Sequence, residues 1–450
     1  MKNRMRSILT VLIAQILCAA LLGGCASPAA PSASAGNGAV VAAVNTRRSY
    51  TAKSNEEFIM SDDYQAFRKE MTDLRKAAEP YRDELSGFSQ DVITHILASE
   101  QAENRVISPV NLFLATAMLA ECADGDTQKE ILSALHVSDT AQLRKAAEAV
   151  WNANYADAPT LTSLLADSMW LSDEIAYEPD TRKVLAEHYH ASSYSGKMGS
   201  EEMNKALQDW TNENTKDLLK DYTKDLATDP RTVLSLISTI YFKTAWQDPF
   251  RAEETEKAVF HGASADAECD MMHESGMNQY YYGEGFSAIV KNFAEGGGMY
   301  FFLPDEGTSL ADVVKNPECL AIVSDPWDYE NSRTVIVNES IPKFTLSGKT
   351  DLTQPLKELG ITKAFDADAA DFGNLTKDTD AFVSQAEHAA VVAIDEEGMT
   401  GAAYTDYMLC GAGMPPEETV DFVLDRPFYF IAASADGTVL FAGTVSDIAA

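Results

Sequence analysis

Serine, histidine and carboxylate side chains occur along the whole chain, but their spacing does not form a catalytic pattern. Ser108 lies in ISPVN, and no G-x-S-x-G run provides the tight turn that exposes a hydrolase serine. His188 and His190 are two residues apart, a spacing that points them to different faces of a helix rather than to one metal ion. The EGGG run at 295–298 lacks the Lys-Ser/Thr pair of a phosphate-binding loop. We therefore expect no enzyme activity, no cofactor and no metal site.

The most unusual segment is EEGMTGAAYTDYMLCGAGMPP at residues 396–416. Strand-like apolar runs lie on both sides of it, VVAI at 391–394 before it and FYFI at 428–431 and VLF at 439–441 after it. A connection of about twenty residues between strands is usually functional or disordered. Its Ala, Thr, Tyr, Met and Leu residues are compatible with a sheet. The composition therefore predicts a functional loop that can also become a strand.

Strand-like alternation along this loop separates two faces. Counted from Gly398, one face holds Met399, Gly401, Ala403, Thr405, Tyr407 and Leu409, and the other holds Thr400, Ala402, Tyr404, Asp406 and Met408. The first face has no charge, which would be costly to desolvate, and no proline, which would remove a ladder hydrogen bond. The single charge lies on the second face. This pattern favours insertion into a sheet with the first face buried.

The first 24 residues have the pattern of a secretory signal. The signal starts with three cations, Lys2, Arg4 and Arg6. Residues 8–22 form an apolar core that is too short and interrupted for a membrane span. The LGGC ending at 22–25 resembles a bacterial lipobox, in which the cysteine is lipidated and becomes the mature N-terminus; an ordinary signal with an incidental cysteine is the alternative. Lipid on Cys25 would anchor a soluble domain to a membrane. No acidic residue follows at Ala26, which leaves surface display open.

Composition divides the remaining chain into three parts. Residues 25–46 are rich in Ala, Ser, Pro and Gly and are expected to form a flexible tether. Residues 47–84 are charged, with helical spacing in KEMTDLRKAAEPYRDEL, and form an extension to which no role is assigned. Residues 85–450 contain no second such linker, so we expect one large domain although the length would allow two.

The chain carries 69 acidic and 35 basic residues, a formal charge of −34. Nucleic acids and anionic membrane surfaces are therefore poor partners, and mutual repulsion between copies favours a monomer. Two of the six cysteines, Cys18 and Cys25, belong to the signal. The other four are scattered without a C-x-x-C pair, so neither a disulfide framework nor a zinc site is expected: Cys122, Cys269, Cys319 and Cys410. Their spacing does not reveal whether any two are paired.

Hydrophobic periodicity predicts helices in the first half and strands in the second. Helical spacing is found in SQDVITHILAS, NLFLATAMLAECA, DTQKEILSALHV, DTRKVLAEHYH and EEMNKALQDWTNENTKDLL, with Asp126-Thr127 as a helix start. Strand patterns are found in TVLSLISTIYF, SAIVKNF, GMYFFLP and RTVIVNESIPKFTLSG. Helices followed by long antiparallel strands indicate an α+β domain.

Seven short motifs occur in a fixed order along this domain. They are ISPVN at 107–111, ADGDTQKEILSAL at 123–135, IYFKTAW at 240–246, FFLP at 301–304, IPKF at 341–344, IDEEG at 394–398 after His388, and RPF at 426–428. Each motif alone is weak, but their order and spacing together are specific. On these motifs the chain from residue 85 to 450 resembles the serpin family.

The resemblance implies a fold and a mechanism. Serpins have a helical N-terminal half, a large antiparallel or mixed central sheet and an exposed reactive-centre loop, here residues 396–416. A serine protease cleaves the loop and is held as an acyl-enzyme while the loop inserts into the sheet, a family behaviour that is a standard example of strand addition. The hinge implied by the resemblance comprises Glu396, Glu397, Gly398, Met399, Thr400, Gly401, Ala402 and Ala403. The implied sheet-opening region comprises Ser108, Trp246 and His388, for which ordinary core packing is the alternative.

The loop departs from the family pattern at its start. Met399 stands where an inhibitory hinge usually has Thr or Ser, Gly401 replaces an alanine, and Tyr404 is large. Met is flexible and apolar and could enter the sheet, although more slowly than Thr. A non-inhibitory serpin acting as carrier, chaperone or decoy therefore stays open, as does inhibition of cysteine proteases.

The family's hinge length places the cleaved bond at Ala412–Gly413, with a slip of about two residues possible. The neighbouring candidate bonds are 409–410, 410–411 and 414–415. No Lys or Arg occurs from residue 399 to 418, whereas trypsin-like enzymes need a cation opposite their pocket carboxylate. We therefore expect elastase-like proteases as targets and chymotrypsin-like enzymes second.

Overall fold

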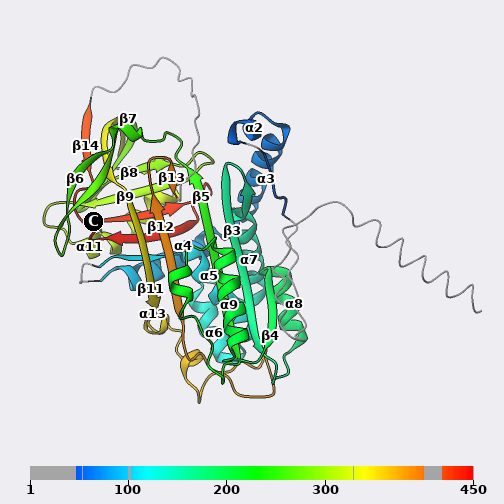
Figure 1. Ribbon diagram of the computed structural model, residues 1–450. Helices are drawn as coiled ribbons and strands as arrows, with labels where there is room; N and C mark the ends of the chain where they lie inside the picture. The colour runs from blue at the N-terminus through cyan, green and yellow to red at the C-terminus, as the bar shows by residue number, and fades with distance from the viewer. Residues whose placement is uncertain (1–46, 53, 100–102, 328, 400–417, 449–450) are drawn as a thin grey trace, which may run out of the picture. The chain divides into compact units, whose positions relative to one another are not determined.

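The computed structural model describes residues 47–448 except 53, 100–102, 328 and 400–417 (Figure 1). The predicted signal and tether, with Cys25, and the predicted cleavage site therefore lie outside the described residues. None of the described helices is both long and apolar enough to cross a membrane.

Helices dominate the described chain as far as residue 154. The α-helices are α2 (Asn55–Ile59), α3 (Asp62–Ala78), α4 (Arg82–Leu97), α5 (Pro109–Cys122), α6 (Gly125–Ala134), α7 (Thr140–Asn154), α8 (Pro179–His188), α9 (Glu201–Asn214), α10 (Lys220–Thr223), α11 (Leu310–Lys315), α12 (Glu318–Ser324) and α13 (Thr353–Glu358). Short 3-10 helices are η1 (Glu79–Tyr81), η2 (Ala252–Glu254) and η3 (Lys363–Phe365). The expected boundary between residues 84 and 85 falls inside α4. The sequence predicted that this helix starts at Asp126-Thr127. The N-cap of α6 is instead Asp124, whose side chain accepts a hydrogen bond from the backbone N–H of Gly125.

The strands form two sheets. One has the order β1-β16-β15-β9-β8-β7-β10-β14, with β6 paired to β7. Its strands are β1 (Arg105–Ile107), β6 (Glu256–His261), β7 (Asp266–Gly283), β8 (Phe286–Asn292), β9 (Gly298–Pro304), β10 (Ser332–Pro342), β14 (Thr419–Val423), β15 (Phe428–Ala433) and β16 (Val439–Val445). Since β10 and β14 are parallel and most other pairs are antiparallel, this sheet is mixed.

The second sheet carries the candidate site. Its order is β11-β12-β13-β5-β3-β2, with β4 paired in parallel to β3. Its strands are β2 (Ala156–Ala158), β3 (Leu161–Ser172), β4 (Ala191–Gly196), β5 (Leu234–Ala245), β11 (Phe344–Asp351), β12 (Glu387–Ile394) and β13 (Gly398–Met399). Helix α5 packs against β5, and α9 packs against β3 and β5 (Figure 1).

The α+β architecture agrees with the sequence prediction, but the first half contains four strands that the hydrophobic pattern did not reveal. Strand β3 is the clearest case, because its last six residues are all buried and its alternation is lost. Its two faces pack against different clusters. Leu165 and Met169 join the main core, whereas Trp170 joins a second cluster with Leu207 and Trp210 of α9. A strand covered on both faces does not show a period of two.

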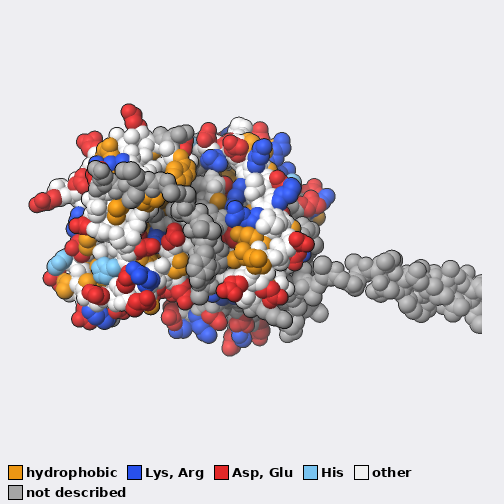
Figure 2. Space-filling model, turned by 90° about the horizontal axis from the view of Figure 1, so that it is seen from above, with side chains coloured by type: hydrophobic (Ala, Val, Ile, Leu, Met, Phe, Trp, Pro, Cys, Tyr) orange, Lys and Arg blue, Asp and Glu red, His pale blue; other side chains and the backbone are white. Residues whose placement is uncertain are grey.

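Acidic and basic side chains are intermixed on the protein surface, although acidic residues are in excess. Figure 2 shows Asp and Glu side chains interspersed with Lys and Arg over the face that it views. Many of these charges are paired across one helical turn, as in Lys205–Asp209 on α9. Such exposed pairs contribute little to stability and mainly keep the surface hydrated.

Candidate functional site

The predicted hinge begins as part of the sheet. Gly398 and Met399 form β13, which lies between β12 and β5 and is antiparallel to both. Met399 is paired with Ile394 and Thr244, and its side chain is only 1% exposed. The loop expected to be exposed from residue 396 is thus held against the protein as far as Met399. A flexible, apolar methionine satisfies this buried position.

Gly398 is required here by space. A Cβ at this position would lie 2.2 Å from the carbonyl oxygen of Thr244 and 2.8 Å from the Cα of Ala245. Both are backbone atoms that cannot rotate away. The structure thus shows a close approach between β13 and β5 that leaves no room for a side chain.

Asp395 and Trp246 fix the turn between β12 and β13. The carboxylate of Asp395 accepts hydrogen bonds from the backbone N–H groups of Glu397 and Gly398, at 2.9 and 3.1 Å. The indole N–H of Trp246 donates to the carbonyl oxygen of Asp395 at 2.9 Å, and its backbone N–H donates to the carbonyl of Glu397 at 2.9 Å. Trp246 is fully buried and stacks on Phe293. The turn is therefore tied to the end of β5.

Glu396 points from this turn to Lys343, the lysine of the IPKF motif. The Nζ of Lys343 lies 2.7 Å from Glu396 Oε2, and the hydroxyl of Thr255 donates to Oε1 at 2.8 Å. Partial burial acts to raise the pKa of Glu396, but the hydrogen bonds and the charge of Lys343 outweigh it and lower that pKa. The backbone carbonyl of Glu396 also accepts from Phe250 N–H at 2.9 Å. Glu396 is therefore ionised and firmly held at neutral pH.

Ser108 and His388 meet beneath the sheet. The backbone N–H of Ser108 donates to Nε2 of His388 at 2.9 Å, which makes that ring nitrogen the acceptor of a neutral imidazole. Burial lowers the pKa of His388 to about 4. Because Trp246 contacts the hinge, the three predicted residues form two groups rather than one.

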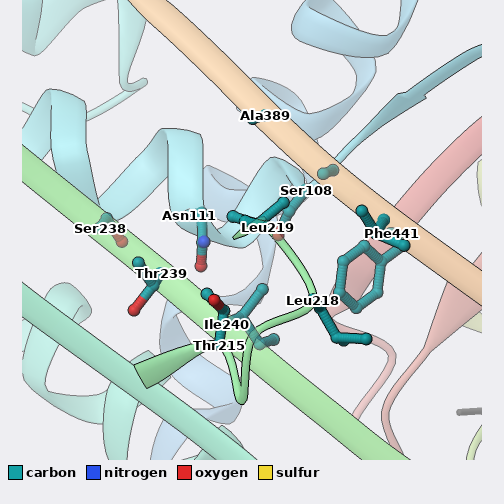
Figure 3. Close-up of a pocket in the computed structure, with 12 residues that line it drawn as sticks. Ser108, Asn111, Thr215, Leu218, Leu219, Ser238, Thr239, Ile240, Ala389 and Phe441 are labelled. Carbon is teal, nitrogen blue, oxygen red and sulfur yellow. The ribbon is translucent and has the colours of Figure 1, made fainter. Parts of the chain in front are cut away.

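A small, partly open pocket lies next to Ser108 (Figure 3). Its walls are residues 238–240 of β5, residues 389–391 of β12, Ser108, Asn111, Phe441, and Thr215, Leu218 and Leu219 from the turn that follows α9. In the described part of the chain, β5 and β12 have no ladder with each other and are joined only through β13. Among the described residues no strand fills the space between β5 and β12 below β13, and the pocket lies in this opening.

Asp167 is a buried acid next to this opening that the sequence analysis did not single out. It is 2% exposed on β3, opposite Ser238 of β5, and neither carboxylate oxygen has a hydrogen-bond partner of good geometry among the described residues. Burial raises the pKa of Asp167 to about 7, and Ser238 offsets part of this effect.

The structure also shows what sequence reasoning missed at the hinge: the partners Lys343, Thr255, Asp395 and Phe250. Lys343 and Asp395 could have been found, since they belong to the IPKF and IDEEG motifs. Thr400 to Ala403 and the Ala412–Gly413 bond lie outside the described residues. Among the described cysteines, Cys122, Cys269 and Cys319 are free and buried, and no cluster of described residues could hold a metal ion.

An α+β chain with two large sheets, one of them bridged at one end by the two-residue strand β13, belongs to a recognisable class of proteins. Comparison with known proteins identifies the class: residues 83–448 match the family described as Serpin (serine protease inhibitor), and the chain belongs to this family. Serpins are protease inhibitors rather than enzymes, which agrees with the missing catalytic patterns.

Two relatives illustrate the likeness in sequence. Alpha-1-antiproteinase 2 of Equus caballus is 29% identical over 375 residues, covering 81% of this chain and 86% of the relative. Leukocyte elastase inhibitor of Sus scrofa is 28% identical over 371 residues, covering 80% and 97%.

Two solved structures share the fold. The thermophilic serpin tengpin in its native state has a TM-score of 0.69 at 22% identity, covering 81% of this chain and 93% of that one. Human thyroxine-binding globulin has a TM-score of 0.69 at 22% identity, covering 84% and 100%.

Proposed function

We propose that this protein is a suicide inhibitor of serine proteases, with elastase-like enzymes as preferred targets and chymotrypsin-like enzymes second. The protease cleaves the loop at Ala412–Gly413, and the segment from Thr400 onward then extends β13 between β12 and β5. The position of β13 between β12 and β5 carries this proposal, because a new strand needs only to continue the two ladders that β13 has already begun.

The loop chemistry supports the choice of target. Residues 399–418 contain no cation, and the residues at the expected bond are small. The small specificity pocket of an elastase-like protease accepts an alanine side chain. The carboxylate in the pocket of a trypsin-like protease would find no cation in this loop. The relative named leukocyte elastase inhibitor agrees with this choice.

The test is to incubate the protein with pancreatic elastase and, separately, with trypsin. We expect a covalent complex that survives denaturing gel electrophoresis with elastase only, and a large rise in thermal stability after loop cleavage. Cleavage without a complex and without a rise in thermal stability would contradict the proposal.

A carrier function is the second candidate. It is favoured by the similarity to thyroxine-binding globulin and by Met399 in place of a small hydroxyl residue. A carrier would be cleaved as an ordinary substrate and would leave elastase active. Inhibition of a cysteine protease is a third outcome of the same assay, with papain in place of elastase.

We also propose that Cys25 carries lipid and holds the inhibitor at a bacterial cell surface. The LGGC run and the tether at residues 25–46 support this placement. A Cys25→Ser variant should lose incorporation of labelled palmitate and leave the membrane fraction. Unchanged membrane association would contradict the anchor.

A further inference from the structure

A buried charge cluster lies in the sheet that does not contain β13. Glu274 of β7 and Glu339 of β10 are directly opposite each other in their ladder, where two like charges repel. Lys291 of β8 forms an ion pair with both carboxylates, and no other cation of the described residues does so. Lys291 and Glu339 are each only 5% exposed. The cluster is therefore held inside the protein by a single lysine.

Folding stability alone does not account for this cluster. Buried ions carry a desolvation penalty, and a buried ion pair is often no more stable than well-packed apolar side chains. Glu339 is also poorly satisfied: the side-chain amide of Asn278 donates to Oε1 at 2.7 Å, but Oε2 has no hydrogen bond among the described residues and lies 3.8 Å from Lys291 Nζ. We therefore looked for a further contact of the lysine.

The ammonium group of Lys291 lies over an aromatic ring. Its Nζ is 4.1 Å from the centre of the Phe250 ring, within the range of a cation–π contact. Phe250 is 5% exposed, and such contacts are stronger where water is excluded. The segment that carries Phe250 is tied to the end of β8 as well, because Gln247 N–H donates to the carbonyl of Asn292 at 2.8 Å. Lys291 thus holds the ring of Phe250 in place.

Phe250 in turn holds the backbone of the hinge. Its N–H donates to the carbonyl oxygen of Glu396 at 2.9 Å. Lys343 and Thr255 bind the side chain of Glu396 instead. Glu396 lies just before β13, so this backbone bond fixes the point from which the loop starts.

We infer that Lys291 is a positioning residue of the inhibitor: it holds Phe250, and Phe250 fixes the backbone about which the cleaved loop turns into the sheet. The inference rests on the proposed inhibitory function and adds to it a residue outside the hinge. Glu274 and Glu339 keep the ammonium group over the ring. A loose pivot delays insertion after cleavage. Water then hydrolyses the acyl-enzyme to a carboxylic acid on the loop and a free serine on the protease, and the protease escapes.

The test compares the stoichiometry of inhibition, the number of inhibitor molecules consumed per elastase inhibited, with the rate of loop cleavage. Lys291→Met keeps the apolar stem of the side chain and removes the ammonium group. We expect the stoichiometry to rise about fivefold, equivalent to about 1 kcal/mol, with the rate of loop cleavage unchanged. A purely structural role would lower the midpoint of thermal unfolding and leave the stoichiometry at the wild-type value.

A second variant covers the case in which Lys291→Met fails to fold because two buried carboxylates lose their cation. The triple variant Lys291→Met/Glu274→Gln/Glu339→Gln removes all three charges and keeps the shapes of the side chains. It should show the same rise in stoichiometry, because the ring of Phe250 still lacks its cation. Wild-type stoichiometry in the triple variant would overturn the inference.

A double-mutant cycle tests whether Lys291 acts through Phe250. Phe250→Leu keeps an apolar side chain without the ring and should also raise the stoichiometry, and combining it with Lys291→Met should raise it no further. Additive effects would show that the two residues act separately and would overturn the inference.

Lys257→Met is the matched control. Lys257 is an exposed lysine that pairs with Asp270 of β7, and its loss should leave the stoichiometry unchanged. Unchanged stoichiometry in every variant, with a wild type that forms the covalent complex, would overturn the positioning role alone. A wild type that forms no complex with elastase would overturn the proposed function, and the positioning role with it.

Discussion

The indole nitrogen of Trp246 lies 2.9 Å from the carbonyl oxygen of Asp395, and this bond joins the end of β5 to the turn that begins the loop. This bond makes a buried aromatic side chain the link between β5 and β12 at the end of the sheet where β13 lies.

Gly398→Ala should disable insertion. The added methyl group would lie 2.2 Å from the carbonyl oxygen of Thr244, so β13 would have to leave the sheet. We expect elastase to cleave the variant as a substrate, with a several-fold rise in the number of inhibitor molecules consumed per protease inhibited. Gly348→Ala on β11 is the matched control, because its nearest neighbours are 3.8 Å away, and it should behave as wild type. Equal stoichiometry in the two variants would contradict the prediction.

Lys343→Ala should loosen the hinge. Removal of the ammonium group leaves Glu396 with only the Thr255 hydroxyl and backbone contacts, at a cost of about 1–2 kcal/mol for a charged hydrogen bond. We expect a lower midpoint of thermal unfolding at pH 7. Lys349→Ala, whose partner is Glu387 at the other end of β12, is the control for a more exposed pair and should change the midpoint less.

The stabilisation that the Lys343–Glu396 ion pair provides should decrease as the pH falls. The pKa of Glu396 is lowered in the folded protein, so the pair stabilises the fold at pH values above the ordinary glutamate pKa. That stability is lost as the pH falls through the folded-state pKa. The difference in unfolding midpoint between wild type and Lys343→Ala should therefore be full at pH 7 and shrink in acid. A difference that grew in acid would contradict this assignment.

Asp167→Asn should stabilise the protein at neutral pH. The pKa of Asp167 is raised to about 7, so the folded protein holds a proton that the unfolded chain releases near its ordinary pKa of 3.8. Stability from this group therefore falls as the pH rises between these values, by up to about 1.4 kcal/mol per pH unit, and is constant above pH 7. The advantage of the asparagine variant, measured by urea unfolding, should grow from pH 5 to pH 7 and then level off. A pH-independent difference would show that Asp167 is ionised throughout.

Phe67→Ala should destabilise the protein, although residue 67 precedes the matched serpin region. Phe67 is 2% exposed and packs on Tyr50 and Phe58, with ring centroids at 5.5 and 6.0 Å. Helix α3, which carries Phe67, lies against α7. A loss of roughly 3–5 kcal/mol is expected for a buried phenylalanine, measured by urea unfolding. Met60→Ala, at an 87% exposed position, should have no effect.

The sequence by itself determined the fold class, the position of the loop at residues 396–416 and the chemical character of its side chains. The order of the motifs along residues 107–428 was enough to identify the family, because each motif meets a local requirement such as a helix cap, a strand or a tight turn. The absence of cations from residues 399–418 restricts the target proteases without any coordinates. Strongly patterned helices such as α5 were found for the same reason, since a largely apolar segment of helical length needs no partner to be recognised.

Only the tertiary structure decided which residues meet. Lys343 and Glu396 are 53 positions apart, and Ser108 and His388 are 280 apart, so no local pattern could pair them. Burial of Asp167 depends on the side-chain clusters that cover both faces of β3, and alternation disappears in a strand covered in this way.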